Sequence, residues 1–181
     1  MIWKFFKKKK EEDGVDALHD LVLDKMKPGY LVDFDMRTFR VNARNEYRWE
    51  EGGVTDEWEL KQGSEVIFLE RDEEDGEVFW TLARKTHIGS VEGNIDQYII
   101  DHEDPPEKVV HAGITYYLEE DDIGEYFKGD TREGLKFVVW DYTDEQKEKQ
   151  LSIEQWGEAN FEVTLGVEVE EYQFSNILPA K

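Results

Sequence analysis

Segments of strand length, in which apolar and polar residues alternate, recur from Leu31 to the end of the chain at intervals of about ten residues. Two of them, TFRVNARNEYRW (38–49) and EVIFLER (65–71), have the period of two that turns one face of a strand toward a core. Asp75-Gly76 lies between two such segments and is a strong signal for a tight hairpin. No alternation of strands with helices is visible. The pattern predicts a mainly β domain, built as an antiparallel meander, barrel or sandwich of about ten or more short strands.

One segment before the strands has helical spacing. Leu18 and Val22 are four residues apart and would share one face of a helix. Asp16 can cap the start of that helix, and Pro28-Gly29 ends the pattern. The sequence therefore predicts one short N-terminal helix within residues 14–27.

The β segments contain two repeats. VIFLERDEEDGEVFWTL (66–82) resembles KQLSIEQWGEANFEVTL (149–165), since in both a strand containing Glu is followed by a Gly-containing turn and a strand ending in Thr-Leu. MRTFRV (36–41) similarly resembles GITYYL (113–118). Either the domain holds two related β-units, or the hairpins are alike because all hairpins share these features. The organisation that we expect is a flexible leader over 1–13, the helix over 14–27 and a β domain over 28–178, with candidate sub-units at 28–86 and 107–178 joined by 87–106.

The chain is strongly acidic, with 44 acidic and 22 basic residues among 181 and a net charge of −22. Such a surface repels the phosphate backbone, so we expect no binding of nucleic acid. The charge either keeps the protein soluble or attracts a cationic partner, such as a basic protein, a metal ion or a polyamine. Cysteine is absent, which excludes disulfides, thiolate zinc sites and Cys nucleophiles. No apolar run approaches the ~20 residues that span a bilayer, so we expect a cytoplasmic protein.

The first ten residues differ in charge from the rest of the chain. Five of them are lysines, and aromatic residues lie beside these lysines. Aromatic side chains can lie at a bilayer interface while lysines contact anionic lipid, at about 1 kcal/mol per lysine. The segment is therefore either a weak, reversible membrane contact or a flexible leader whose lysines meet the acidic body. The candidate membrane-contact residues are Trp3, Phe5, Phe6, Lys7, Lys8, Lys9 and Lys10.

The sequence lacks the recognised motifs for catalysis, for phosphate binding and for metal binding. The four histidines show no metal-ligand spacing, and the four serines lie outside any nucleophile motif. Pairs of carboxylates are uninformative, because 44 acidic residues place some pair at any spacing by chance. We therefore predict no enzyme activity, no cofactor and no metal site.

One strand near the end of the chain, LSIEQW, combines an acidic residue with an aromatic one. Strand alternation places Leu151 and Ile153 on one face, and Glu154 and Trp156 on the other. Tryptophans of a small β domain are more often packing anchors than parts of a groove. If Trp156 is exposed beside Glu154, the two are candidates for a recognition surface, with Trp58 as a third member. If Trp156 is buried, Glu154 is structural.

The order of motifs along the chain carries a family resemblance. The first half contains Pro28-Gly29, Val32-Asp33-Phe34-Asp35, Glu57-Trp58-Glu59-Leu60 and Phe68-Leu69-Glu70. The second half contains HAGITYYLEE, VVWDYTDE and LSIEQWGEANFEVTLGVEV. Over residues 27–178 this order resembles the bacterial "domain of unknown function 4178" family, although Tyr30 replaces that family's frequent Asp and residues 87–104 match none of its pattern. The resemblance implies a small cytoplasmic accessory protein linked to membrane stress, with no established catalytic residues.

These observations lead to three hypotheses of different classes. The first is a non-enzymatic cytoplasmic binding or adaptor domain that contacts an unidentified protein partner and touches the membrane through residues 1–10. The alternative is a binder of a small cationic ligand, either a polyamine or a divalent metal ion, through carboxylates beside aromatic rings. The third is an enzyme, which no nucleophile–base arrangement in the sequence supports.

Overall fold

The structure, a computed structural model, describes residues 21–179 of the 181-residue chain. The strands in this part are β1 (Leu31–Phe34), β2 (Arg37–Trp49), β3 (Val54–Gln62), β4 (Glu65–Glu74), β5 (Glu77–His87), β6 (Lys108–His111), β7 (Ile114–Phe127), β8 (Leu135–Asp144), β9 (Lys149–Gly157), β10 (Asn160–Val169) and β11 (Phe174–Leu178). The helix is α1 (Ile95–His102), and short 3-10 turns occur at Leu23–Lys25, Ile88–Ser90 and Glu171–Gln173. A mainly β, antiparallel domain with more than ten strands is therefore confirmed, and Asp75-Gly76 forms the predicted hairpin turn between β4 and β5. β2 and β7, with 13 and 14 residues, are longer than the short strands that were expected.

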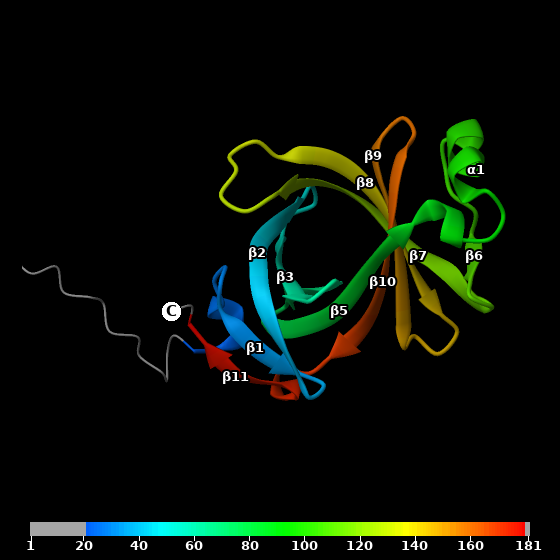
Figure 1. The fold of residues 1–181 in the computed structure, drawn as a ribbon. Coiled ribbons are helices and arrows are strands. Elements are labelled where there is room, and N and C mark those ends of the chain that lie inside the picture. Colours follow the sequence, from blue (N-terminus) through cyan, green and yellow to red (C-terminus); the bar gives the residue numbers. More distant parts are fainter. Residues whose placement is uncertain (1–20, 180–181) are drawn as a thin grey trace, which may run out of the picture.

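Eight strands of the described part of the chain form a closed barrel, in the order β2-β3-β4-β5-β10-β9-β8-β7. The second half of β2 closes it by pairing with the second half of β7, from Glu46 opposite Phe127 to Trp49 opposite Gly124. The first half of β2 instead pairs with β1, which pairs with β11, and the first half of β7 pairs with β6. Consequently β1 and β11 lie on one side of the barrel, and β6 with α1 lies on another (Figure 1).

The two halves of the chain build the barrel in the same way. In each half a short strand forms a hairpin with a long strand, and three further strands follow as a meander: β1 to β5 and β6 to β10. The turns of the two first hairpins, Asp35-Met36 and Ala112-Gly113, have positive φ at both residues, as tight two-residue hairpin turns require. The repeated sequences therefore lie at matching places in the two halves. That both halves descend from one duplicated unit stays a prediction.

A β-bulge in each long strand changes which face of the strand points inward. Between Val41 and Ala43 of β2, and between Leu118 and Glu120 of β7, the pairing with the neighbouring strand shifts by one residue. Because side chains alternate along a strand, one extra residue moves all later side chains to the opposite face. The first half of each long strand thus packs into an apolar core, whereas the second half faces the barrel lumen.

Two apolar cores lie outside the barrel wall. The first includes Trp58 and Trp80 of the wall, and β1, β11 and the turn Leu23–Lys25 pack against it. The second includes Trp140 and Ile153 of the wall, and α1 and β6 pack against it. These wall residues alternate along their strands with the residues that face the lumen. The outer faces of these wall strands are therefore covered by apolar packing. Their inner faces carry the other side chains, which line the lumen.

The predicted N-terminal helix is wrong over its described part. Only Leu23–Lys25 forms a single 3-10 turn there, and Val22 before it is extended. Leu23 and Met26 are buried in the first core, and the Met26 carbonyl accepts a hydrogen bond from Trp58 Nε1 at 2.9 Å. These tertiary contacts override the local helical preference. The remainder of the prediction, residues 14–20, and the leader lie outside the described residues.

The connection expected over 87–106 contains α1, which the sequence analysis missed. Ile95 and Ile99 lie one turn apart and are buried in the second core. The sequence signal of this helix is weak, because the helix has eight residues and Asn94 before it makes no side-chain cap bond. A helix this short offers too few periodic positions to stand out from a loop.

Candidate functional site

A cavity of about 560 Å³ lies inside the barrel, and all eight barrel strands contribute to its lining. Twelve of the described lining residues are Asp or Glu, and none of them is Lys, Arg or His. Glu70, Asp72, Asp141 and Glu154 lie along the wall, whereas Glu168 and other exposed carboxylates lie at the mouth. A cleft lined by one sign of charge concentrates counter-ions, so this cavity attracts cations.

Lys85 of β5 does not line the cavity itself, but its ammonium group also lies in the barrel lumen. Its Nζ lies 2.8 Å from Glu162 Oε1 and 3.7 Å from Glu57 Oε2. It also lies over the rings of Phe68 and Tyr126, at 4.7 and 5.7 Å from their centroids. Burial alone would lower the pKa of Lys85, but the neighbouring carboxylates, Glu57 first, outweigh burial and raise the pKa. The lumen therefore stabilises a charged ammonium with carboxylates and aromatic rings.

Glu57 already has a full set of partners at that end of the lumen. Asn45 Nδ2 donates a hydrogen bond to Glu57 Oε1 at 2.6 Å. The hydroxyls of Tyr47 and Tyr126 donate to its two oxygens at 3.2 and 3.3 Å. With Lys85 added, this buried carboxylate needs no further donor.

A cluster of aromatic rings connects the two ends of the lumen. Tyr47 and Trp49 line the cavity, and the Tyr126 ring lies under Lys85. The centroids of Tyr47 and Tyr126 are 4.8 Å apart, and those of Phe137 and Trp156 are 4.6 Å apart. The cavity thus borders aromatic faces, which attract cations as well as apolar groups. The members of the cluster are Tyr47, Trp49, Tyr126, Phe137 and Trp156.

Two polar atoms of the cavity wall are buried without a hydrogen-bond partner, namely Glu154 Oε2 and Thr164 Oγ1. Glu154 is 6 % exposed and Thr164 is 7 % exposed, and they lie on the neighbouring strands β9 and β10. Buried polar atoms are usually bonded, and leaving one unsatisfied costs about 1–3 kcal/mol. A ligand that donates hydrogen bonds at this wall would satisfy both atoms.

The low-dielectric surroundings change the acidity of the wall carboxyls. Burial raises the pKa of Glu154 to about 8, although Lys85 opposes the shift. Burial also raises the pKa of Asp141 to about 6, against the effect of the Ser152 hydroxyl that donates to it. For Glu70, burial first and neighbouring carboxylates second raise the pKa well above its usual range. Each shift reflects the cost of an ionised carboxylate with too few counter-charges.

The structure separates the three residues predicted to form a recognition surface. Trp58 is 0 % exposed and lies in the first core outside the barrel wall, so its assignment to a surface is wrong. Glu154 and Trp156 do share a face of β9, but that face is the interior of the barrel. Trp156 is half-buried and packs against Tyr126 and Phe137. The exposed surface that was considered is therefore an interior wall.

Several residues of this wall escaped the sequence analysis, above all Glu70, Lys85 and Thr164. The clue that could have found them is a strand in which residues on both faces are buried. In β3, for example, Glu57 and Trp58 are adjacent and both are fully buried. A single polar residue in such a strand does not reveal that a closed barrel turns it inward.

Other predicted features lie outside this site. The candidate membrane-contact residues Trp3, Phe5, Phe6, Lys7, Lys8, Lys9 and Lys10 lie outside the described residues. Within residues 21–179, no helix has both the length and the apolar character needed to cross a bilayer. The same part of the chain contains no group of three or more His, Asp or Glu arranged to hold a metal ion.

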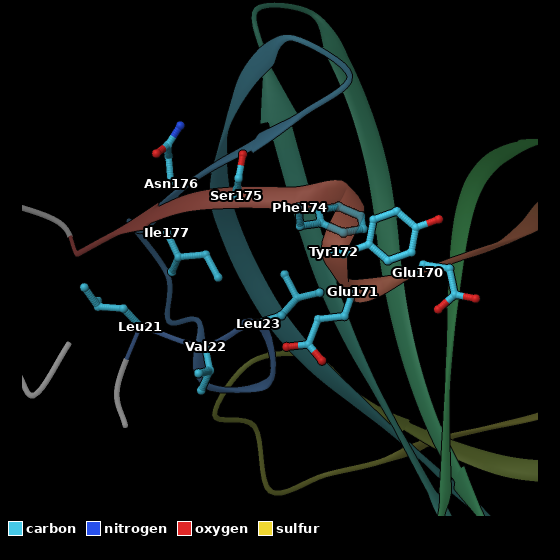
Figure 2. A pocket seen from close by; sticks show the side chains of 10 residues that line it. All are labelled: Leu21, Val22, Leu23, Glu170, Glu171, Tyr172, Phe174, Ser175, Asn176 and Ile177. Carbon is cyan, nitrogen blue, oxygen red and sulfur yellow. The ribbon is translucent and has the colours of Figure 1, made fainter. Parts of the chain in front are cut away.

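A second hollow of about 560 Å³ lies beside β11, as Figure 2 shows. Leu21, Leu23 and Ile177 give it an apolar wall, and Glu170 and Glu171 lie at one end. None of its described lining residues is a buried polar group without a partner. It therefore lacks the unsatisfied acceptors that distinguish the lumen.

Comparisons with known proteins place the chain in a family without assigning it an activity. An uncharacterized protein of Aquifex aeolicus (strain VF5) is 25 % identical over 178 residues, which cover 98 % of this chain and 96 % of that protein. No solved structure matches the chain. Residues 27–171 match the family described as Domain of unknown function (DUF4178), and the protein therefore belongs to that family, as its motifs suggested.

Proposed function

We propose that this protein binds a small organic cation of the ammonium type, such as a polyamine, in the lumen of its barrel. The observation that carries the proposal is the pair of unpartnered acceptors, Glu154 Oε2 and Thr164 Oγ1, in a cavity whose described lining residues include no basic side chain. An ammonium group brings both N–H donors and positive charge. It would therefore satisfy the acceptors and neutralise the wall at once.

The surroundings of Lys85 support this choice of ligand. The protein's own ammonium lies between Glu162 and Glu57 and over two aromatic rings. The cavity offers the same kinds of group, with Glu154 and Glu70 as carboxylates and Tyr47 and Trp49 as rings. A ligand ammonium would thus find the environment that already suits Lys85.

An organic ammonium fits this lumen better than a divalent metal ion does. Calcium takes six to eight oxygen ligands, and magnesium demands a near-ideal octahedron. Residues 21–179 hold no cluster of carboxylates or imidazoles arranged for such coordination. Separate carboxylates beside rings suit a chain of ammonium and methylene groups instead.

We also propose a wider role for the protein, as a non-enzymatic binding protein of the cytoplasm whose acidic surface contacts a protein partner. The net charge of −22 supports a cationic contact rather than contact with nucleic acid. Affinity capture from a native lysate tests for such a partner, and recovery of nucleic acid instead of a basic protein would contradict the proposal.

Titration with spermidine and putrescine, followed by calorimetry and thermal unfolding, tests the proposed ligand class. We expect saturable binding and a higher Tm, because a ligand that binds only the folded state stabilises it. Glu154→Gln should weaken binding by about 10- to 100-fold, since it removes a charge-assisted hydrogen bond. Glu92→Gln, the same change at an exposed position outside the cavity, is the matched control. A Tm shift no larger than that given by sodium or magnesium chloride at equal ionic strength would remove the proposal.

Membrane contact by residues 1–10 is a separate proposal that rests on their sequence. Replacement of Lys7, Lys8, Lys9 and Lys10 by Gln should reduce co-sedimentation of the protein with anionic vesicles, because each lysine contributes about 1 kcal/mol near such a surface. Uncharged vesicles serve as the control. Equal recovery of the parent chain and the variant with anionic vesicles would contradict the proposal.

A further inference from the structure

The lumen contains more carboxylates than Lys85 can neutralise. Lys85 Nζ is in contact with Glu162 and Glu57, at 2.8 and 3.7 Å. Glu154 Oε2 is left buried without a partner, and Glu70, which lines the same cavity, is influenced mainly by burial and by neighbouring carboxylates, with Lys85 opposing them. Lys85 therefore compensates the buried negative charge of these two cavity carboxylates only in part.

The groups around Glu154 offer it no second cation. Apart from Lys85, they are carboxyl groups and one phenol, and each comes from a different barrel strand. The titratable and charged groups that face it are Tyr47 of β2, Glu57 of β3, Glu70 of β4, Lys85 of β5, Asp141 of β8 and Glu162 of β10.

We propose that Glu154 and Glu70 hold protons before the ligand binds and exchange them for the organic cation, so that binding releases protons to the solvent. The inference rests on the proposed function, since it concerns the same ligand and the same wall. In the exchange, the carboxyl O–H bond breaks and the proton passes to water or buffer. The ammonium then takes the place of the proton as the positive partner, and total charge is conserved.

The acidities of the two groups agree with this exchange. Burial raises the pKa of Glu154 to about 8, and the pKa of Glu70 is also well above its usual range. An acid with a raised pKa is protonated below that pKa, so Glu154 carries a proton at pH 7 when no cation is bound. A cation favours the ionised form and lowers the pKa. Affinity should therefore rise with pH by roughly tenfold per pH unit for each proton released, and the contribution of Glu154 should level off above about pH 8.

Calorimetric titration of the full chain with putrescine at pH 7, in two buffers of different ionisation enthalpy, tests the inference. Putrescine is fully protonated at this pH, so any proton released comes from the protein. We expect about one to two protons released per putrescine bound, and fewer at pH 8.5. Glu154→Gln and Glu70→Gln should each lower the number by up to about one, and Glu92→Gln should leave it unchanged.

The possible outcomes separate the two proposals. Putrescine binding with the same heat in both buffers would overturn proton exchange and leave cation binding in place. Absence of binding at every pH from 6 to 8.5 would overturn both. If a variant binds too weakly to titrate, the pH dependence of the parent chain decides: an affinity that does not change between pH 6 and pH 8 contradicts the exchange.

Discussion

Lys85→Met is expected to destabilise the protein by about 3–5 kcal/mol at pH 8, because it leaves buried carboxylates without their shared counter-charge. Lys85 is the cation beside Glu57 and Glu162, and its side chain is only 19 % exposed. Methionine keeps much of the length and the apolar contacts of lysine. The loss of stability therefore reflects removal of the charge rather than a change in packing. Denaturant unfolding of the variant and of the parent chain measures this loss.

The loss should be smaller at pH 5 than at pH 8. Glu154, with its raised folded pKa, binds more protons in the folded state than in the unfolded state between pH 5 and 8. Stability therefore falls as pH rises through that window, and it falls further once Lys85 is absent. Glu57→Gln combined with Lys85→Met should recover part of the loss. Lys136→Met, at a side chain that is 81 % exposed, is the control and should change little. Equal losses at Lys85 and Lys136 would contradict the expected role of Lys85.

Trp58→Ala should cost about 3–5 kcal/mol and lower Tm by roughly ten degrees or more. The side chain of Trp58 is 0 % exposed, and its ring centroid lies 5.7 Å from that of Trp80. The Arg44 guanidinium lies 5.3 Å from the centroid of the Trp58 ring. Removal of the Trp58 ring leaves a cavity in the first core and frees the Met26 carbonyl. Thermal and denaturant unfolding measure the effect.

Two further variants separate packing from hydrogen bonding at this position. Trp58→Phe keeps a ring but leaves the Met26 carbonyl without its donor, so it should cost about 1–3 kcal/mol. Tyr172→Ala removes an aromatic side chain that is 82 % exposed, and it should change stability by less than about 0.5 kcal/mol. A Trp58→Ala variant as stable as Tyr172→Ala would contradict the position of Trp58 in the core.

Local sequence patterns predicted the strands well, because the alternation of apolar and polar residues is visible in the sequence itself. TFRVNARNEYRW became β2, and Asp75-Gly76 became the turn that such a pair usually makes. Barrel closure was not predictable in this way, because it depends on pairing of β2 with β7, some eighty residues apart. The bulge after Val41 also broke the simple alternation that would have assigned one face of β2 to one core.

The candidate site was predicted only in part for the same reason. Alternation placed Glu154 and Trp156 on one face of a strand, and they do share it. Alternation cannot say whether a polar face meets solvent or the inside of a barrel, since both make the same pattern. The excess of acidic residues hid the rest, because Glu70 and Asp141 resemble many exposed carboxylates in the sequence.

Because the apolar cores lie outside the barrel wall, the residues that pack the fold differ from those that line the lumen. Trp58 and Ile153 pack on the outer side of their strands, while the neighbouring residues Glu57 and Glu154 face the lumen. Substitutions in the lumen can accumulate without removing the outer packing. Relatives could thus keep this scaffold while recognising different molecules, and a protein engineer could rewrite the inner wall to make a sensor for a chosen cation.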